Sequence, residues 1–408
     1  MSMKPILYIP TIGEVGKAVE SYKQNMKEFG YDFPVIVADR SVGKSGNINT
    51  KQISKLDGVY HLSEKQILDY LNSISDTGLL KSMGFGNAMN LGYLLATTFK
   101  ADIMHRRDGD TRAENFLARK KFSKGLDVFG IHQALIGKKI EEVKIISQEK
   151  YHPWADLKLV PSEKRIMAVT GGVTGCNPMP LEVFRDFPEG FIKINPQFRD
   201  SEKLRKRIAG ELVLFDESRF QILSVRNLSG SNVCLHTDVF TKFCCPPADG
   251  VGTDDEHTAK LMGIDEMPIL FAYAPVGHYE SYPDDVKDIV VREFLTKDFI
   301  LARNFILNST PSPIEKLDVC LFLTTSNEFE NYRKTREKAV LEAVKILLKA
   351  PRNSVRNKSL IDAGKYLQKN LTKLLDQNDQ YLKNYFILQE QWPELVKNAG
   401  KFNTEELF

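Results

Sequence analysis

The sequence predicts an α/β fold, in which a mixed, mostly parallel sheet carries helices on both faces and a helical region follows at the C-terminus. Over the first hundred residues, short apolar segments of strand length alternate with amphipathic segments of helix length. Such alternation is typical of parallel sheets that are covered on both sides. From about Asp284 onward the apolar residues instead recur at helical spacing, which predicts a run of helices.

The individual elements follow from local pattern. Strands are expected where β-branched and other apolar residues run without interruption, and helices where apolar residues recur every three or four positions. Gly30 marks the expected end of the first helix. In chain order we expect a strand at 6–10, a helix at 15–30, a strand at 34–39, helices at 65–74 and 86–99, a strand at 101–107, a helix ending near 262, and C-terminal helices at 339–348 and 360–375.

The composition limits the class of protein. The 408 residues are 42% hydrophobic and 27% charged, as in ordinary globular proteins. This length suffices for one large domain with an appendage, or for two domains. The net charge of +3 is small for such a length, so the sequence does not predict a nucleic-acid-binding protein.

The cysteines and the apolar runs indicate a cytoplasmic protein. The five cysteines include no CxxC pair, so a zinc site is not expected. Their odd number favours a reducing compartment. No apolar run reaches the roughly 18–20 residues of a membrane span, and the first residues lack the apolar core of a signal peptide.

The most informative motif is Asp108-Gly109-Asp110, which follows the expected strand at 101–107. Residues i and i+2 of an extended chain point to the same side. The carboxyl end of a strand is also where open α/β sheets bind ligands. Because hard cations prefer carboxylate and phosphate oxygens, the motif predicts a site for Mn²⁺ or Mg²⁺. The alternative is a solvated acidic turn. Arg106, Arg107 and Arg112 flank the motif and are candidates to neutralise a phosphate.

Further polar or Gly-rich segments occur at other predicted element ends, and each also has a structural interpretation. Asp39 follows the second strand, where it can be a turn former. Asp254-Asp255-Glu256 precedes a helix, and acidic residues there also suit the helix dipole. His278 can be a structural histidine. The other segments are Pro10-Thr11 at the end of the first strand, Gly86–Gly92 with Asn90, and Gly230-Ser231-Asn232.

In this order along the chain, the motifs resemble those of GT-A-fold glycosyltransferases, especially the family-2-like group. The resemblance covers about residues 4–282. It implies a GT-A catalytic domain at 1–283, with an insertion around 112–225. The C-terminal region at 284–408 lies outside the resemblance, and the helical spacing predicts that it is mostly helical. That region is expected to cover the core or to form a homo-oligomer contact.

The resemblance also implies roles for single residues. Asp108-Gly109-Asp110 matches the DxD motif, and with His278 it gives the expected metal-binding set of Asp108, Asp110 and His278. Asp254 matches the position of the catalytic base. Asp255 is the alternative, because Thr253 stands where the family usually has glutamate. The expected donor-binding residues are Pro10, Thr11, Asp39, Asn90, Arg107, Asp108, Gly230 and Ser231.

The implied activity is that of a metal-dependent hexosyltransferase. It would transfer a sugar from a nucleotide-sugar donor, a UDP- or GDP-sugar, to an acceptor hydroxyl with inversion. A carboxylate base would deprotonate the acceptor, and Mn²⁺ or Mg²⁺ would offset the charge of the leaving diphosphate. The acceptor is not identified. Trp154, with Tyr151 and His152, is a candidate stacking surface for a sugar ring.

Three alternatives remain. A sugar-nucleotide nucleotidyltransferase would share the sheet, but Ile12–Lys17 lacks the arginine pattern of its first loop. A non-catalytic partner with a degenerate GT-A site would also fit the fold. A P-loop NTPase is suggested by Ser41-Val42-Gly43-Lys44-Ser45, but Ala38 stands where that motif requires its first glycine.

Overall fold

The computed structural model describes most of the chain. The described residues are 3–113, 116–117, 120–121, 127–143, 162–175, 222–224, 228–252, 254–272, 274–278, 285–309 and 327–407. All structural statements below concern these residues.

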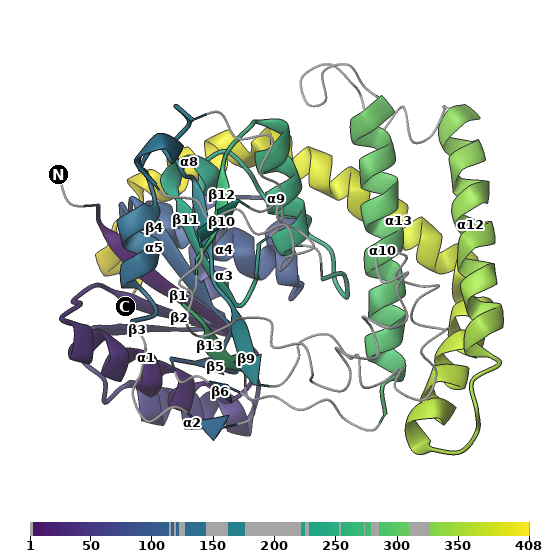
Figure 1. Cartoon of the computed structure of the whole chain (residues 1–408), viewed down its shortest axis with the longest axis horizontal. Helices are drawn as coiled ribbons and strands as arrows, with labels where there is room; N and C mark the ends of the chain where they lie inside the picture. Colours follow the sequence, from purple (N-terminus) through teal and green to yellow (C-terminus); the bar gives the residue numbers. More distant parts are fainter. Residues whose placement is uncertain are drawn as a thin grey trace.

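A sheet of eight strands forms the centre of the molecule, in the order β10-β12-β8-β11-β4-β1-β2-β3 (Figure 1). Strands β3, β2, β1 and β4 pair in parallel, as does β8 with β12. Strand β11 runs antiparallel between β4 and β8, which confirms the predicted mixed sheet. The bounds are β1 Pro5–Thr11, β2 Val35–Asp39, β3 Val59–Ser63, β4 Ile103–Arg107, β8 Ala168–Thr170, β10 Ile222–Ser224, β11 Asn232–His236 and β12 Ile269–Ala272.

Two small sheets accompany the large one. In the first, β5 (Thr111–Arg112), β13 (Val276–His278) and β9 (Val173–Gly175) lie side by side. The second pairs β6 (Phe116–Leu117) with β7 (Lys120–Lys121). Because β5 begins directly after the acidic turn, the first small sheet extends the structure at the carboxyl end of β4.

Helices cover both faces of the large sheet, as β1 illustrates. Its side chains alternate between two apolar clusters: Ile6 and Tyr8 belong to one, and Leu7 and Ile9 to the other. The cluster of Leu7 contains residues of α1 (Gly16–Phe29). The cluster of Tyr8 contains residues of α3 (Glu64–Ile74), α4 (Phe85–Thr98) and α9 (Asp254–Ile264). Two further short helices are α5 (Gly130–Leu135) and α8 (Thr237–Phe240).

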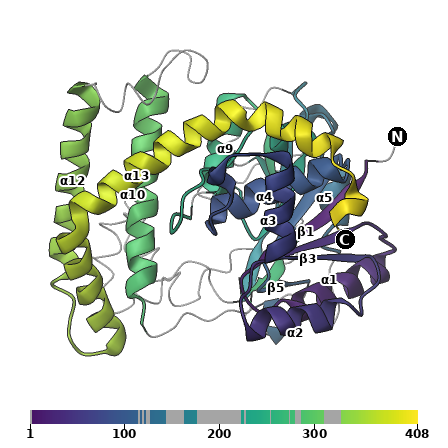
Figure 2. The same cartoon turned by 180° about the vertical axis from the view of Figure 1, so that it is seen from behind.

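Three long helices form the C-terminal region: α10 (Lys287–Ser309), α12 (Asn327–Leu347) and α13 (Val355–Lys401). Figure 2 shows α13 reaching from α12 across the molecule to the helices that cover the sheet. Its Trp392 and Leu395 are buried in the same apolar cluster as Tyr8. The expected C-terminal helices are therefore present, and α13 completes the main core.

Among the α-helices and strands that precede β4, two were not predicted. Helix α2 (Lys44–Ile53) begins within the Ser-Val-Gly-Lys-Ser segment, and no helix was expected there. Gly43, with φ of +64°, precedes it in a left-handed conformation that suits glycine. Strand β3, the edge strand, is only partly buried, which explains why its sequence lacks a continuous apolar run.

Within the described residues, no helix has the combination of length and apolar character that crossing a membrane requires.

Candidate active site

The acidic turn Asp108-Gly109-Asp110 connects β4 to β5 and is held in place by Thr111, the residue that follows it. The backbone N–H and the hydroxyl of Thr111 both donate to the carbonyl of Asp108, at 3.0 and 2.7 Å. Thr111 also lies opposite His278 in the antiparallel pair of β5 and β13. The small sheet therefore brings His278 next to the turn, although it lies 168 positions after Asp110 in the sequence.

Asp110 and His278 are in direct contact, with 3.0 Å between Nε2 of the histidine and Oδ2 of the carboxylate. The His278 side chain is 8% exposed, whereas that of Asp110 is 31% exposed. The histidine is therefore held in the protein while the carboxylate reaches the surface of the turn. This pair belongs to the metal-binding set that the sequence motifs predict.

Asp108 is bound by two side chains from neighbouring strands and loops. Its Oδ1 lies 3.1 Å from Nη2 of Arg106, and its Oδ2 accepts a hydrogen bond of 2.6 Å from the Ser231 hydroxyl. Ser231 precedes β11, which pairs with β4. The structure thus brings together Asp108 and Ser231, two of the expected donor-binding residues, and adds Arg106.

Arg107 was expected at the donor site, but its side chain lies on the opposite face of β4 from Arg106. It is fully buried, and its guanidinium donates to the carbonyls of Val128 at 2.9 Å and Val233 at 3.2 Å. The ring of Phe129 lies 5.3 Å below it. Burial lowers the pKa of Arg107 from its ordinary value. Because side chains alternate along a strand, only one of the two arginines can face the turn, and that one is Arg106.

Gly230 connects this arrangement to the expected base. Its backbone N–H lies 3.3 Å from Oδ2 of Asp255, the second residue of α9. A Cβ at Gly230 would approach Nη1 of Arg106 to 2.8 Å, so a larger residue there would require the Arg106 guanidinium to shift. Asp254 opens α9, and its side chain lies outside the described part of the chain. Asp255 is therefore linked to Asp108 through Gly230 and Arg106.

The ends of β1 and β2 lie beside the turn. A Cβ at Gly109 would come within 3.0 Å of Oγ1 of Thr11, so the turn packs closely against the end of β1. In the parallel register, Pro10 lies opposite Ala38 and Thr11 opposite Asp39. The carboxyl ends of β1, β2 and β4 therefore form one edge, as expected for ligand sites of α/β sheets.

Asp39 is almost fully buried and accepts hydrogen bonds from three residues. These are the Ser41 N–H at 2.8 Å, the Asn49 amide at 3.0 Å and Nε2 of His61 at 3.0 Å. Burial alone would raise the pKa of Asp39, but these hydrogen bonds outweigh it and hold that pKa below its ordinary value. In this structure Asp39 organises the loop after β2, and its contact with a nucleotide stays a prediction.

Asn90 has a structural environment. Its side chain is fully buried and binds the backbone of Cys245 at two points, through the Nδ2 group at 2.9 Å and through Oδ1 at 2.7 Å. The glycines of the same segment pack equally closely: a Cβ at Gly86 would collide with Pro246, and one at Gly92 with Tyr8. The segment therefore docks α4, and a contact of Asn90 with a donor would require those bonds to break.

The C-terminal helices hold the chain just before α9, which the sequence did not indicate. Thr296 of α10 accepts the backbone N–H of Gly252 at 3.0 Å. Gln389 of α13 accepts the N–H of Cys244 at 3.3 Å and donates to the carbonyl of Lys242 at 3.1 Å. No periodicity reveals such contacts, because each joins residues more than 40 positions apart.

The chemistry of the turn suits a hard divalent cation. Asp108 and Asp110 offer carboxylate oxygens and His278 an imidazole nitrogen, a donor set that takes Mn²⁺ readily. Within the described residues, however, no three such side chains converge closely enough to enclose an ion by themselves. A cation at this turn would therefore also need oxygens from water or from a bound phosphate.

Several predictions lie outside the described residues. They are the stacking surface of Tyr151, His152 and Trp154, most of the insertion around 112–225, and two of the five cysteines, Cys176 and Cys320. Cys234, Cys244 and Cys245 are described; all three are buried, and none forms a disulfide among the described residues.

No protein-family model matches the sequence, and no curated protein matches it either. Among solved structures, the chain is similar to glucosyl-3-phosphoglycerate synthase from Mycobacterium tuberculosis in complex with Mn²⁺, UDP-glucose and phosphoglyceric acid. The identity is 14%, over 74% of this chain and 79% of that one, with a TM-score of 0.38. It is also similar to a mannosyltransferase from Pyrobaculum calidifontis in complex with GDP-mannose and Mn²⁺, with 14% identity over 96% of this chain and 87% of that one and a TM-score of 0.41.

A third similar structure is mannosyl-3-phosphoglycerate synthase from Rubrobacter xylanophilus. It shares 12% identity over 78% of each chain, with a TM-score of 0.40. All three TM-scores lie below 0.5, so the proposals below rest on the residues of this chain.

Proposed function

We propose that this protein is a metal-dependent glycosyltransferase that moves a sugar from a nucleotide-sugar donor to an acceptor hydroxyl. The observation that carries the proposal is the meeting of acidic and polar side chains from four separate segments at the carboxyl end of β4. Asp108 and Asp110 come from the turn, His278 from β13, Ser231 from the loop before β11, and Asp255 from α9.

The charges of the site suit a diphosphate bound through a cation. Asp110 and His278, 3.0 Å apart, would hold Mn²⁺ or Mg²⁺ together with Asp108. When bound, the cation would offset negative charge on the leaving diphosphate. Arg106, 3.1 Å from Asp108, keeps a positive charge beside the turn even without the cation. Two carboxylates alone would repel a diphosphate, so Arg106 favours donor binding.

The base is proposed to be one of the first two residues of α9. Asp255 is supported by its bond to Gly230, which holds one carboxylate oxygen at 3.3 Å and so limits the rotation of the side chain. Its Oδ1 caps the Glu256 N–H at 2.7 Å. Asp254, which the motif pattern favours, is the alternative. A carboxylate at this position would take the proton of the acceptor hydroxyl as that oxygen attacks the sugar.

Several finer features belong to this proposal. A single displacement assisted by a base inverts the anomeric carbon. The donor nucleotide would contact the ends of β1 and β2 around Thr11 and Asp39. Residues 1–283 would carry the chemistry, and residues 284–408 would support it. UDP- and GDP-sugars are the proposed donors, and the acceptor is not identified.

The proposal is tested by calorimetric titration with UDP and GDP, each with and without Mn²⁺, followed by donor hydrolysis assays. We expect one nucleotide to bind only with the cation, and the matching sugar nucleotide to be hydrolysed slowly to free sugar and nucleoside diphosphate. If neither nucleotide binds under either condition, the proposal fails. If pyrophosphate is released from a nucleoside triphosphate and a sugar phosphate, the protein is a nucleotidyltransferase instead.

A further inference from the structure

We propose that Arg303 of α10 is a positioning residue for catalysis, which acts through His257 to fix the helix that carries the candidate base. This inference rests on the proposed function and adds a role for the C-terminal helices. The following contacts support it.

His257 lies on α9 only two residues after Asp255, and it is fully buried. Its Nδ1 is 3.1 Å from Nη1 of Arg303. Because a guanidinium can only donate, Nδ1 must accept, and the imidazole is neutral with its proton on Nε2. Burial, followed by the charge of Arg303, holds the pKa of His257 well below its ordinary value, which agrees with this assignment.

Arg303 reaches α9 from a helix far away in sequence. It is almost fully buried, and its second amino group donates to Asn304 at 3.0 Å. On the other side of the imidazole, the ring of Tyr385 from α13 meets His257 edge to face, with 4.4 Å between centroids. His257 is therefore enclosed by α10 and α13, so the first turn of α9 cannot rotate independently of the C-terminal helices.

Arg303 is charged although it is almost fully buried, which indicates a role beyond packing. A buried guanidinium whose hydrogen-bond acceptors are neutral is costly, and an apolar side chain of the same volume would usually fill such a space at less cost. Burial lowers the pKa of Arg303, and the nearby charge of Glu256 opposes that shift. Arg303 thus provides a directed bond to His257 and a positive charge beside the acidic start of α9, neither of which packing alone supplies.

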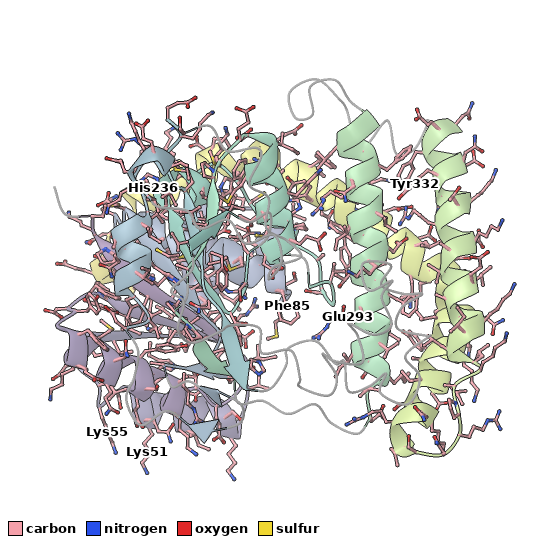
Figure 3. All side chains as sticks on the ribbon, viewed as in Figure 1. Lys51, Lys55, Phe85, His236, Glu293 and Tyr332 are labelled. Atoms are coloured by element: carbon pink, nitrogen blue, oxygen red, sulfur yellow. The ribbon has the colours of Figure 1, made fainter. Side chains whose placement is uncertain are left out.

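Neighbouring contacts extend the same connection to the loop before α9. The hydroxyl of Thr296, two turns before Arg303 on α10, accepts the N–H of Gly252. Helix α10 also contacts α4: the guanidinium of Arg292 on α10 lies 5.4 Å from the ring centre of Phe85 at the start of α4. Figure 3 labels Phe85 on α4 and Glu293, the neighbour of Arg292, on α10. Helix α10 therefore contacts the loop before α9, α9 itself and the start of α4.

The test compares Arg303→Met, which keeps the volume, with Phe299→Leu as a matched control. Phe299 is fully buried on the same helix, one turn from Arg303, and has no polar contact with α9. We expect Arg303→Met to raise amide hydrogen exchange in residues 254–264 by about tenfold or more, and Phe299→Leu to leave it unchanged. Exchange is measured by mass spectrometry on the full chain, so this result does not depend on the activity.

The kinetic part uses donor hydrolysis with Mn²⁺. Arg303→Met should lower kcat by about tenfold to a hundredfold with little change in the KM for the donor, because a misplaced base affects the reaction and not the binding. Arg303→Lys should restore part of kcat, because one N–H is enough to reach His257. His257→Gln, which keeps an acceptor, should be more active than His257→Phe, and these two variants decide the matter if Arg303→Met does not fold.

Unchanged exchange in α9 for Arg303→Met, or a kcat equal to that of Phe299→Leu, would overturn the inference. If the wild-type protein hydrolyses no sugar nucleotide, the proposed function fails, and the exchange measurement still decides whether Arg303 fixes α9.

Discussion

Two clusters in this molecule combine aspartates with basic side chains but differ in their surroundings. At the turn after β4, Asp108 and Asp110 are each paired with one basic side chain, Arg106 or His278. In the C-terminal helices, Asp298 of α10 and Asp379 of α13 are both bound to Arg336 of α12, at 2.6 and 2.7 Å.

The clusters differ in exposure and in how completely their hydrogen bonds are made. The carboxylates of the turn are 30% and 31% exposed, whereas that of Asp298 is 5% exposed. Both oxygens of Asp298 accept from Arg336, and Asn378 adds a further bond of 2.8 Å. Burial opposes the charge of Arg336, but these bonds outweigh it and raise the pKa of Arg336. A saturated, buried cluster is suited to fixing helices, whereas half-exposed carboxylates are accessible to the ligand that we propose.

The largest expected effect is on nucleotide binding, which should depend on the carboxylates of the turn and not on those bound to Arg336. Asp110→Asn should weaken Mn²⁺-dependent nucleotide binding by more than about 100-fold, because changes beyond the direct ligands already cost 10- to 100-fold in metal sites. Its free energy of unfolding should fall by no more than about 1 kcal/mol, as expected for the loss of a partly exposed ion pair. Calorimetry and urea unfolding measure the two effects. The matched variant Asp298→Asn should bind normally, and equal losses in both variants would break the comparison.

The second prediction concerns stability. Arg336→Met leaves Asp298 buried without its counter-charge, and removal of one partner of a buried pair costs about 3–5 kcal/mol. The free energy of unfolding in urea should fall by that amount. Nucleotide binding by the folded variant should be unchanged. A loss below about 1 kcal/mol would mean that the cluster contributes no more than a surface ion pair.

The third prediction divides binding from reaction within the site. Asp255→Asn should lower kcat of donor hydrolysis by about 10²–10⁴-fold, the usual contribution of a general base, and leave Mn²⁺-dependent nucleotide binding intact. Asp254→Asn is the matched control one residue away. If Asp254→Asn loses the activity and Asp255→Asn keeps it, the base is Asp254.

The smallest effect is a dependence of stability on pH. Burial, followed by the charge of Arg107, holds the pKa values of His105 and His132 well below their ordinary value. The unfolded chain therefore binds more protons than the native state below about pH 6.5, and stability falls as the pH is lowered through that range. Each such histidine contributes about 1.4 kcal/mol per pH unit well below pH 6.5.

His132→Phe tests this dependence. His132 stacks on His105 with 6.0 Å between ring centroids, and neither of its nitrogens has a hydrogen-bond partner among the described residues. Phenylalanine keeps the ring without the proton-binding site. Urea unfolding between pH 5 and 7 should show a slope smaller by about 1.4 kcal/mol per pH unit at the acidic end. An unchanged slope would mean that His132 is protonated in the folded state.

The sequence predicted the first strands and helices because their apolar patterns are unambiguous, and it identified the acidic turn because two carboxylates follow a buried strand. It missed α2, whose anchor is polar. Asn49 is fully buried there, accepts the N–H of Val15 at 2.9 Å and donates to Asp39 at 3.0 Å. Local propensity does not register such tertiary hydrogen bonds.

The candidate site was partly predictable for a similar reason. The motif gave Asp108 and Asp110, but only the alternation of β4 selects Arg106 over Arg107. The contacts of Arg303, Thr296 and Gln389 with the segment around α9 join distant parts of the chain, so no local pattern contains them. The C-terminal helices could be predicted as helices, and their connection to the site could not.

The proposed function depends on a cation that binds at the turn after β4 and in turn binds a diphosphate. Crystals soaked with Mn²⁺ and UDP test it directly through the anomalous signal of manganese. We expect a peak at coordination distance from Asp110 and His278, with diphosphate oxygens completing the shell. A peak elsewhere in the molecule, or UDP bound at another surface with the turn unoccupied, would contradict it.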